Sequence, residues 1–569
     1  MIEMRQAEAT KMPKIWFVLL IAQASSVFGV PTRTEGNAPL TPPFWGVRYA
    51  VTGVLRLPYA QIEEPFAAWF DGVKNRSRID FYGGMDAVIQ RSDKGDFGQI
   101  FKLSPMTDEK VVNKKSCFQI NGTKEGKVTP QASLPDTGNF QFTGMVSYKG
   151  QYVESWRLVN EMGSKVNTYT VYVTKTARSP VYYEMLGFDS LYGSHYDDYK
   201  ITYDSYMTEY NDTVFDVPIK DIECGGFPGP GHEANIVVNP MQEFIHPTND
   251  EHLHPMFSDF TTKYKKDYIN QGIDEYHKRL HIFRHNLRFI HSTNRKGLTY
   301  KVKVNHLADQ TPNELRKLRG KKKSDGKYNG GKEFKPVLKP HEILKPHEIP
   351  ETMNWRLRGA VTPVKDQAVC GSCWSFGTTG TIEGALFLKT GKLVRLSQQN
   401  LVDCSWGFGN NGCDGGEDFR SYQWIMKHGG LATEDSYGGY LGANGYCHFN
   451  NKEVVIGAKL TGYVNITSGD MNQLKEAIAM KGPVSVGIDA SHLSLSFYSH
   501  GVYYEPKCGN TPDSLDHAVL AVGYGVLNGE PYWLIKNSWS TYWGNDGYVL
   551  MSQKDNNCGV ATAATFVTM

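Results

Sequence analysis

Alternation of apolar and polar residues dominates the first part of the chain. It runs through residues 49–57 (YAVTGVLRL), 140–146 (FQFTGMV) and 169–173 (YTVYV). Arg78–Met85 has the composition of a further strand followed by a turn. A period of two is typical of strands with one buried face. Residues 30–235 are therefore predicted to form a mainly antiparallel β domain whose dense aromatic residues make its core. Binding of a lipid or peptide on the apolar side of a curved sheet is the alternative interpretation.

Two later segments have the periodicity of helices. Residues 272–294 place a set of side chains at spacings of three and four, which lie along one stripe of a helix. That stripe consists of Glu275, Arg279, Ile282, Phe283, Asn286, Ile290 and Asn294. The second segment, Trp374–Lys389, has Ile382 and Leu386 among its apolar positions. It is predicted to be a helix, with Cys373 at its N-terminus.

The segments between these elements divide the chain. Ile15–Ala22 is a short apolar run preceded by lysines, so a secretory signal peptide is expected, and the run is too short to span a membrane. Residues 236–255 have little periodicity, and residues 321–350 are rich in Lys and Pro, as in exposed linkers that are readily cut. The predicted divisions are 1–29 (signal peptide), 30–235 (β domain), 236–255 (linker), 256–320 (helical segment), 321–350 (basic linker) and 351–569 (C-terminal domain). The mature protein is expected to begin near Ile349–Glu351.

Composition adds limits to this division. A chain of 569 residues is too long for a single core, and a net charge near +2 gives no reason to expect a nucleic-acid partner. Residues 256–350 contain 22 Lys and Arg against 10 Asp and Glu, whereas residues 351–569 contain 15 against 19. A basic segment therefore precedes an acidic domain. We expect the two to attract each other, and acid to weaken that attraction by protonating carboxylates.

Nine cysteines and four glycosylation sequons fit a secreted chain. An odd number of cysteines suggests one free thiol, but spacing alone does not give the disulfide pairing. The sequons begin at Asn75, Asn121, Asn211 and Asn465. On a secreted chain these asparagines are candidate glycosylation sites.

The candidate chemistry centres on Cys370-Gly-Ser-Cys373-Trp374. A thiol becomes a good nucleophile only as the thiolate, and a helix N-terminus or a neighbouring histidine lowers its pKa. Gln367, six residues before Cys373, can donate a hydrogen bond to an oxyanion. Taken alone, Cys-x-x-Cys is also compatible with a redox pair or half of a zinc site. No nearby Cys and His set has zinc-finger spacing, so neither a metal nor a cofactor is expected.

This motif resembles the signature of the papain family. Asp516–Val519 is similar to the family's catalytic histidine segment, Lys536–Trp539 to its asparagine segment and Cys413–Gly416 to its substrate-binding glycine loop. The stripe in residues 272–294 is similar to the ERFNIN motif of cathepsin-L-type propeptides. A second propeptide motif, Gly-x-Asn-x-Phe-x-Asp, is kept only in part: Asn305 and Asp309 match, while Lys303 and Leu307 depart from it. The overall order resembles the insect 26/29 kDa two-chain cysteine proteases.

The resemblance implies a fold and an activity. Residues 351–569 would form an α+β papain-like domain with a helical left lobe and a β-barrel right lobe, preceded by an inhibitory propeptide of the I29 type. The activity implied is that of a cathepsin-L-like cysteine endopeptidase made as an inactive precursor. Its partners would be protein and peptide substrates, its own propeptide and an N-terminal chain that stays associated after cleavage. The expected location is the secretory pathway, in lysosomes or granules or outside the cell.

The resemblance also implies roles for individual residues. Cys373 and His517 would form a thiolate–imidazolium pair, Asn537 would orient the imidazole beneath Trp539, and Gln367 would stabilise the oxyanion. The disulfides implied are Cys370–Cys413, Cys404–Cys447 and Cys508–Cys558, which leaves Cys117 and Cys224 for each other. The substrate-binding residues implied are Gly415, Gly416, Glu417, Asp418, Gly487, Leu515, Asp516, Trp539 and Ala563.

Two questions stay open at this point. Glu417 and Asp418 depart from the apolar pair of cathepsin L, and either admit a basic or polar residue at substrate position P2 or point to solvent. The competing account of the whole chain is a catalytically silent protease fold whose N-terminal β domain binds a ligand or targets the protein. The intact set of Cys373, His517, Asn537 and Gln367 favours the enzyme.

Overall fold

The computed structural model describes residues 40–108, 110–191, 193–217, 223–226, 237–246, 253–323, 329–335 and 349–569. The predicted signal peptide lies outside these ranges. The chain divides into two compact units, Met1–Thr41 and Pro42–Met569. Within the described ranges, no helix combines the length and the apolarity needed to cross a membrane.

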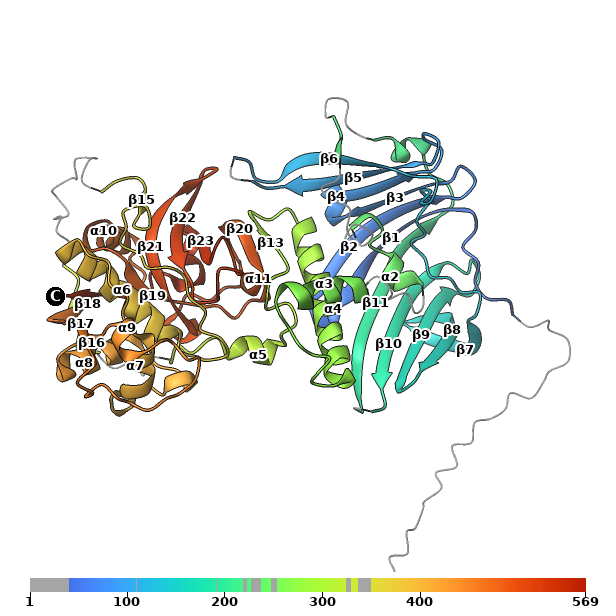
Figure 1. Cartoon of the computed structure of the whole chain (residues 1–569). Coiled ribbons are helices and arrows are strands. Elements are labelled where there is room, and N and C mark those ends of the chain that lie inside the picture. Colours follow the sequence, from blue (N-terminus) through green and yellow to red (C-terminus); the bar gives the residue numbers. More distant parts are fainter. Residues whose placement is uncertain are drawn as a thin grey trace, which may run out of the picture. The chain divides into compact units, whose positions relative to one another are not determined.

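The N-terminal part of this unit is a 12-stranded sheet (Figure 1). Its strands are β1 (Arg48–Leu57), β2 (Ile62–Asp71), β3 (Arg76–Phe81), β4 (Asp86–Arg91), β5 (Gln99–Met106), β6 (Lys114–Asn121), β7 (Gln141–Tyr148), β8 (Gln151–Met162), β9 (Lys165–Thr174), β10 (Pro180–Asp189), β11 (Ser194–Met207) and β12 (Gly225–Gly226). Their order is β12-β6-β5-β4-β3-β2-β1-β11-β10-β9-β8-β7. Apart from the parallel pair β12–β6, neighbouring strands are antiparallel, as the alternating pattern predicts.

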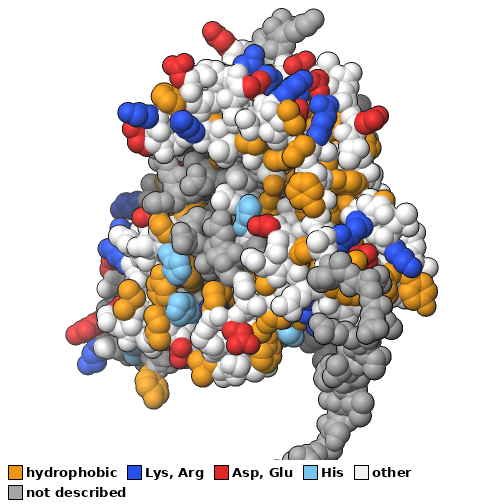
Figure 2. Space-filling model, turned by 90° about the vertical axis from the view of Figure 1, so that its right-hand side faces the viewer, with side chains coloured by type: hydrophobic (Ala, Val, Ile, Leu, Met, Phe, Trp, Pro, Cys, Tyr) orange, Lys and Arg blue, Asp and Glu red, His pale blue; other side chains and the backbone are white. Residues whose placement is uncertain are grey.

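Alternation decides which face of this sheet is buried. In β1, Tyr49, Val51 and Leu55 are buried, whereas Thr52 between them is exposed. Burying one set of alternate side chains gives each strand its favourable hydrophobic free energy. Two large side chains near the β7 edge stay partly outside this core: Phe142 and Tyr152 are 40% and 75% exposed. Figure 2 shows one side of the molecule, on which hydrophobic side chains lie among charged ones.

The prosegment begins with α2 (Gln242–Ile245), α3 (Leu253–Lys263), α4 (Ile273–Arg295), β13 (Tyr300–Val302) and α5 (Pro312–Arg316). The predicted helix at 272–294 is confirmed within one residue at each end. The linker predicted at 236–255 is wrong in its described part, because α2 and the start of α3 lie there. Phe244 and Ile245 are buried in the core that the N-terminal sheet shares with these helices. The short apolar run escaped a periodicity argument because α2 is only four residues long.

Helix α4 uses two different faces. The stripe identified from the sequence ties α4 to the chain that follows it: Arg279 pairs with Glu314 at 2.8 Å, and Asn286 donates to the Ala308 carbonyl at 2.8 Å. A second stripe faces the N-terminal sheet, against β2 and β5 (Figure 1). A helix with two such faces can link one body to another.

Buried ion pairs hold the second stripe of α4. Arg288 donates to both carboxylate oxygens of Asp197 on β11, at 2.8 and 3.1 Å, and to Glu243 of α2 at 2.5 Å. Arg295 donates to Glu64 on β2 at 2.6 Å. Although burial alone would raise it, the Arg288 guanidinium holds the pKa of Asp197 below its usual value. Buried charges are tolerated only when they are paired in this way.

The C-terminal part combines helices with a 10-stranded sheet. The helices are α6 (Cys373–Thr390), α7 (Gln398–Cys404), α8 (Asp418–His428), α9 (Glu434–Tyr437), α10 (Met471–Lys481) and α11 (Leu493–Ser496). The strands are β14 (Lys332–Glu333), β15 (Met353–Asn354), β18 (Gly462–Asn465), β19 (Val484–Ile488), β20 (Tyr498–Tyr503), β21 (His517–Leu527), β22 (Glu530–Lys536), β23 (Tyr548–Ser552) and β24 (Ala564–Thr568), with β13 joining at one end. A separate pair is formed by β16 (Leu431–Ala432) and β17 (Ile456–Ala458). Two prosegment strands, β13 and β14, thus lie at opposite ends of this sheet.

Parts of the basic linker pack against the C-terminal part, although its composition predicts an exposed segment. β14 pairs in parallel with β18, and Phe334 is buried against Phe566 with ring centroids 5.7 Å apart. Lys321 and Lys322 make backbone hydrogen bonds to Asp516 and Gly416. Composition predicted an extended segment correctly, but strand addition to an existing edge supplies the backbone partners that water would otherwise provide. Residues 336–348 lie outside the described ranges, whereas the predicted start of the mature protein, near Ile349–Glu351, lies within them.

The three disulfides implied by the resemblance and the pair left over from it are all present. They join Cys117 to Cys224, Cys370 to Cys413, Cys404 to Cys447 and Cys508 to Cys558. Cys373 is the free cysteine, and it is buried. The odd cysteine count is thereby explained.

The interface between α4 and the sheet should weaken in acid. Burial lowers the pKa of His285, which faces Asp197, Arg288 and Arg284, to about 4, and that of His291, beside Arg295 and Lys102, to about 3. A histidine whose pKa is lowered in the closed state stabilises that state above pH 6.5. This stabilisation is lost as the pH falls from 6.5 towards the lowered values. At pH 5 the loss is about 2 kcal/mol for each histidine.

Hydrogen–deuterium exchange of the α4 amides, corrected for intrinsic rates, measures this effect. We expect protection to fall between pH 6.5 and 4 in the intact precursor, and to fall less in His285→Gln. The control is His254→Gln, because His254 lies exposed on α3. Protection of α4 that is independent of pH would contradict the account.

Candidate active site

The free thiol lies at the start of α6. Cys373 is the first residue of that helix, is fully buried, and accepts hydrogen bonds at Sγ from the backbone N–H groups of Ala518 (3.4 Å) and Gly320 (3.3 Å). Ala518 belongs to β21, whereas Gly320 belongs to the prosegment. Gly320, which precedes Ala518 by nearly two hundred positions in the sequence, therefore covers the thiol.

His517 and Asn537 form the second element of the site. His517 begins β21, and its Nε2 lies 2.8 Å from Oδ1 of Asn537, which directly follows β22. The same Oδ1 accepts the backbone N–H of Ser538 at 2.7 Å, which identifies it as the oxygen of the amide. Nε2 must therefore carry a hydrogen, and Nδ1 is left to exchange protons. The Trp539 ring lies 4.7 Å from the imidazole ring, between centroids, and shields this hydrogen bond.

Gln367 is fixed from both ends. Its Oε1 accepts from the Ser538 hydroxyl at 2.6 Å, and its Nε2 donates to the carbonyls of Cys370 (2.8 Å) and Leu318 (2.9 Å). Leu318 belongs to the prosegment. Its carbonyl oxygen occupies the place where the negatively charged oxygen of a reaction intermediate would accept a hydrogen bond from the same N–H group.

The prosegment crosses the site as an extended strand. Gly416 donates its N–H to the Gly320 carbonyl at 2.8 Å and accepts from Lys322 at 3.0 Å, while Lys321 donates to the Asp516 carbonyl at 3.0 Å. Arg319 forms an ion pair of 2.8 Å with the Asp516 carboxylate. The backbone of this segment occupies the contacts that an extended peptide substrate would use.

Close approach requires glycine at position 320. A Cβ atom placed there would lie 1.7 Å from the Gly371 carbonyl oxygen, which no side chain can tolerate without displacement of the backbone. Gly415 has a φ of 110°, in the region that favours glycine, and a Cβ there would lie 2.7 Å from the Gly320 carbonyl. The fit between prosegment and site therefore rests on two facing glycine positions.

Burial sets the protonation state of the pair. It raises the pKa of the Cys373 thiol to about 11, against the lowering effect of the two backbone donors. It lowers the pKa of His517 to about 4, although Asn537 acts to raise it. The helix N-terminus alone led us to expect a lowered thiol pKa, but desolvation beneath the prosegment outweighs it. At a pH between these two pKa values, the Cys373 thiol and the His517 imidazole of the precursor are both neutral.

The residues implied to bind substrate lie around the prosegment strand. Gly416, Gly415 and Asp516 contact its backbone, as described above. Gly487 lies beside Leu515, and its N–H donates to the Ala563 carbonyl at 3.1 Å. Glu417 is 4% exposed, so its predicted alternative of pointing to solvent is wrong. Asp418 is partly exposed and accepts from the Thr565 hydroxyl at 2.7 Å.

One supporting residue was missed by the sequence. The Tyr440 hydroxyl donates to the Gln367 carbonyl at 2.9 Å and lies 2.5 Å from the Ser372 hydroxyl. It thereby braces both chain segments that meet at the thiol. Tyr440 lies in an irregular segment between α9 and β17, and no motif or periodicity singled it out.

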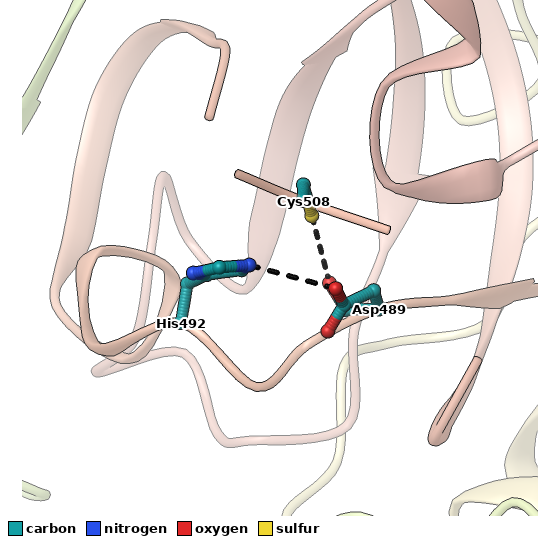
Figure 3. A group of neighbouring side chains, drawn as sticks. All are labelled: Asp489, His492 and Cys508. Carbon is teal, nitrogen blue, oxygen red and sulfur yellow. Dashed lines mark hydrogen bonds and ion pairs between the residues drawn. The ribbon is translucent and has the colours of Figure 1, made fainter. Parts of the chain in front are cut away.

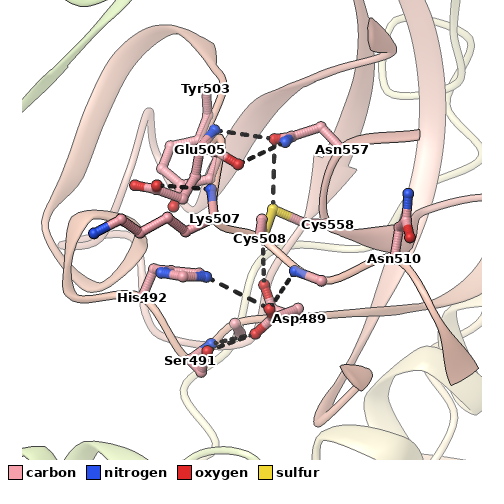
Figure 4. The surroundings of a disulfide bond; sticks show 12 residues. Asp489, Ser491, His492, Tyr503, Glu505, Lys507, Cys508, Asn510, Asn557 and Cys558 are labelled. Carbon is pink, nitrogen blue, oxygen red and sulfur yellow. Dashed lines mark hydrogen bonds and ion pairs between the residues drawn. A yellow bond between two sulfur atoms is a disulfide. The ribbon is translucent and has the colours of Figure 1, made fainter. Parts of the chain in front are cut away.

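A group of potential metal ligands lies in the C-terminal part (Figure 3). It consists of Asp489, His492 and Cys508. Among the described residues, this is the group whose side-chain atoms lie close enough together to hold a metal ion. The Cys508 sulfur is bonded to Cys558, so it offers no thiolate (Figure 4). Asp489 is already engaged by His492 at 3.5 Å and by the Gly509 N–H at 2.7 Å. The group is better described as a braced disulfide than as a metal site.

The four sequons differ in accessibility. Asn75, Asn121 and Asn211 are exposed. Asn465 is half-buried on β18, and its amide donates to Asn329 of the prosegment at 2.7 Å. Glycosylation stays a prediction, and Asn465 is the sequon least suited to it in the precursor.

Comparison with known proteins matches this geometry. Residues 349–568 match the papain family cysteine proteases, and residues 257–315 match the cathepsin propeptide inhibitor domain (I29). A cathepsin L-like peptidase from Aedes aegypti is 47% identical over 320 residues, which cover 54% of this chain and 91% of the relative. Digestive cysteine proteinase 1 of Homarus americanus is 44% identical over 55% of this chain and 95% of its own length. The structure of digestive procathepsin L 3 from Tenebrio molitor larval midgut is similar with a TM-score of 0.50 and 37% identity, covering 56% of this chain and 99% of that one.

Substitution of Gly320 should release the prosegment. In Gly320→Ala the added methyl group meets the Gly371 carbonyl, so the segment must leave the cleft or shift. With an overpacking cost of about 1–3 kcal/mol, the open fraction should rise roughly 5- to 150-fold. Hydrolysis of a fluorogenic peptide at pH 7, before any acid treatment, measures this fraction. Lys323→Ala, at an exposed position three residues on, is the matched control. Equal activity of the two variants would contradict the assigned contact.

Proposed function

The chain belongs to the papain family of cysteine proteases, and from this premise we propose that Cys373, His517, Asn537 and Gln367 are its catalytic residues. The protein is a protease precursor that carries its own inhibitory propeptide. The observation that supports the assignment best is the convergence of the free thiol, the histidine–asparagine pair and the glutamine amide beneath one prosegment strand. A catalytically silent fold would have no need to cover an intact set.

The reaction follows from the positions of these groups. Once the prosegment leaves, water returns and the proton of Cys373 passes to Nδ1 of His517, giving the thiolate–imidazolium pair. The thiolate attacks the scissile carbonyl carbon, and the Gln367 side chain and the Cys373 backbone N–H stabilise the oxyanion. The imidazolium then protonates the leaving amine as the thioester forms. Water, deprotonated by the same imidazole, hydrolyses the thioester and restores the thiol.

Asn537 and Trp539 act on the histidine. Asn537 Oδ1 holds the hydrogen on Nε2, so that Nδ1 takes part in every proton transfer. Trp539 keeps water from that hydrogen bond. An endopeptidase binds chain on both sides of the scissile bond. We assign an endopeptidase because the prosegment strand runs through the site from Arg319 to Lys322.

Protonation of buried histidines explains why acid would release the prosegment. The closed state lowers the pKa of His517 as well as those of His285 and His291, so acid favours the open state. The cleft carboxyls Glu417 and Asp516 do not supply this effect, because burial raises the pKa of both in the closed state. Activation in an acidic compartment of the secretory pathway fits this sign, and four disulfides fit an oxidising compartment.

The N-terminal sheet holds the prosegment in this proposal. Its apolar face packs on α2, α3 and α4 of the same chain, and buried ion pairs from Arg288 and Arg295 close the contact. This occupancy supports a role as a partner of the propeptide rather than as a free binder of lipid. Continued association of the N-terminal chain after cleavage is an expectation of the same contact.

Two substitutions test the catalytic assignment. In acid-treated protein, Cys373→Ala should abolish peptide hydrolysis, and Gln367→Ala should lower kcat by about 10²–10³ with a smaller change in KM, because the amide acts on the transition state. Asn451→Ala, at an exposed loop position, should leave both constants unchanged. A fully active Cys373→Ala protein would overturn the mechanism.

A further inference from the structure

A second part of the prosegment, residues 329–335, binds the catalytic part at one edge of its sheet. Strand β14 pairs there in parallel with β18, and the Phe334 N–H donates to the Asn465 carbonyl at 2.8 Å. In the described sheet, β18 lies between β24 and β14, so β14 covers what would otherwise be an edge strand. The backbone groups of an edge strand are a template for another extended chain. Loss of the prosegment would therefore expose such a template.

Side chains of the catalytic part hold Asn329 at the start of this segment. The amides of Asn465 and Asn329 pair reciprocally: Asn465 Nδ2 donates to Asn329 Oδ1 at 2.7 Å, and Asn329 Nδ2 donates to Asn465 Oδ1 at 3.0 Å. The Asn329 carbonyl accepts from Gln423 of α8 at 2.9 Å and from the Tyr463 hydroxyl. Strand pairing needs only backbone groups. These side-chain contacts therefore select the residue that is bound.

The two glycines that follow Asn329 fit closely against Tyr463. A Cβ atom placed on Gly331 would lie 2.8 Å from atoms of the Tyr463 ring. Gly330 has a φ of 86°, in the region that favours glycine. A bound chain is therefore expected to carry two glycines at these positions.

The groove that takes Phe334 is apolar and larger than this one side chain. Phe334 is 7% exposed and lies against Phe566. With β14 in place, the groove still has a volume of about 960 Å³. Its apolar lining from α6, β18 and α10 includes Ala385, Leu388, Val464 and Met480. An aromatic residue three positions after the second glycine is thus the apolar anchor of the segment.

We infer that the enzyme without its prosegment has a second peptide-binding site along β18, which takes extended segments of protein substrates with the pattern Asn-Gly-Gly-x-x-Phe. The inference rests on the proposed function, since cleavage near Ile349–Glu351 separates β14 from the enzyme. One chain can reach this groove and the cleft together. Asn329 is six residues after Lys323, which follows the strand in the cleft, and six extended residues span at most about 22 Å. A substrate held at both places gains effective concentration at the thiol.

The first test measures binding of a peptide with the sequence of residues 329–335, Asn-Gly-Gly-Lys-Glu-Phe-Lys. It uses acid-activated enzyme that mass spectrometry shows to lack the prosegment, with the thiol blocked by an epoxide inhibitor so that the cleft is filled. We expect saturable binding in calorimetry. Alanine in place of the phenylalanine should weaken it roughly 10- to 150-fold, because burial of that ring is lost.

A pair of enzyme variants assigns this binding to the groove. Gln423→Ala removes one hydrogen bond to the asparagine carbonyl and should weaken binding about 2- to 10-fold. The matched control is Lys427→Ala, an exposed position on the same helix, which should leave binding unchanged. Absence of saturable binding, or equal binding by both variants, would overturn the inference.

The second test measures kcat/KM for peptide substrates that share one scissile sequence joined by a ten-residue Gly/Ser linker to Asn-Gly-Gly-Lys-Glu-Phe or to its alanine version. The pattern is attached before the scissile sequence in one pair and after it in another. We expect the phenylalanine substrate to be cut about tenfold faster in at least one arrangement. An excess of the free peptide should remove the advantage. Equal values in both arrangements would overturn the inference.

The epoxide separates this inference from the proposed function. An enzyme that is processed in acid and labelled at its thiol, but shows no binding and no advantage for the pattern, refutes only the second site. A protein that is neither processed nor labelled refutes the proposed function, and the second site with it.

Discussion

The contact of the Gly320 backbone with the Cys373 sulfur is the constraint on which the rest of the structure depends. A peptide segment that lies this close to a nucleophile both blocks the cleft and removes water from it. Removal of water is the larger chemical effect, because it returns thiol and imidazole to their neutral forms. Latency is therefore a property of protonation as well as of access, and the same chain carries both the reactive group and the condition that silences it.

The N-terminal sheet helps to hold the prosegment in place, although it lies away from the cleft. Helix α4 offers one stripe to the prosegment around Asp309 and the opposite stripe to the sheet, where Asp197 and Glu64 are buried under arginines. An isolated prosegment helix would have to hold the cleft by its own packing. Here the sheet also holds the helix, and the histidines in the same interface give it a response to acid. The two halves of the chain are thus coupled through the propeptide.

The sequence predicted the elements whose patterns are long. Alternation identified β1, the spacing of Glu275 to Asn294 identified α4, and the motifs around Cys373 and His517 identified the site. Three features were beyond it. The second stripe of α4 is made of charged and histidine residues, which a hydrophobic pattern assigns to solvent. The linker prediction failed at Phe244 and Lys321, because short segments are stabilised by surfaces that are distant in sequence. The raised pKa of Cys373 depends on a covering strand, while the sequence shows only the local helix N-terminus.

The rate of alkylation of Cys373 by iodoacetamide as a function of pH tests the central claim most directly. It is measured on the intact precursor and on the acid-activated enzyme, with labelling at Cys373 identified by mass spectrometry. We predict that the precursor thiol reacts slowly at neutral pH and gains reactivity only towards its pKa of about 11, whereas the activated enzyme reacts readily from mildly acidic pH upwards. The same profile for both forms would contradict the account, because the prosegment would then block the cleft without changing the state of the thiol.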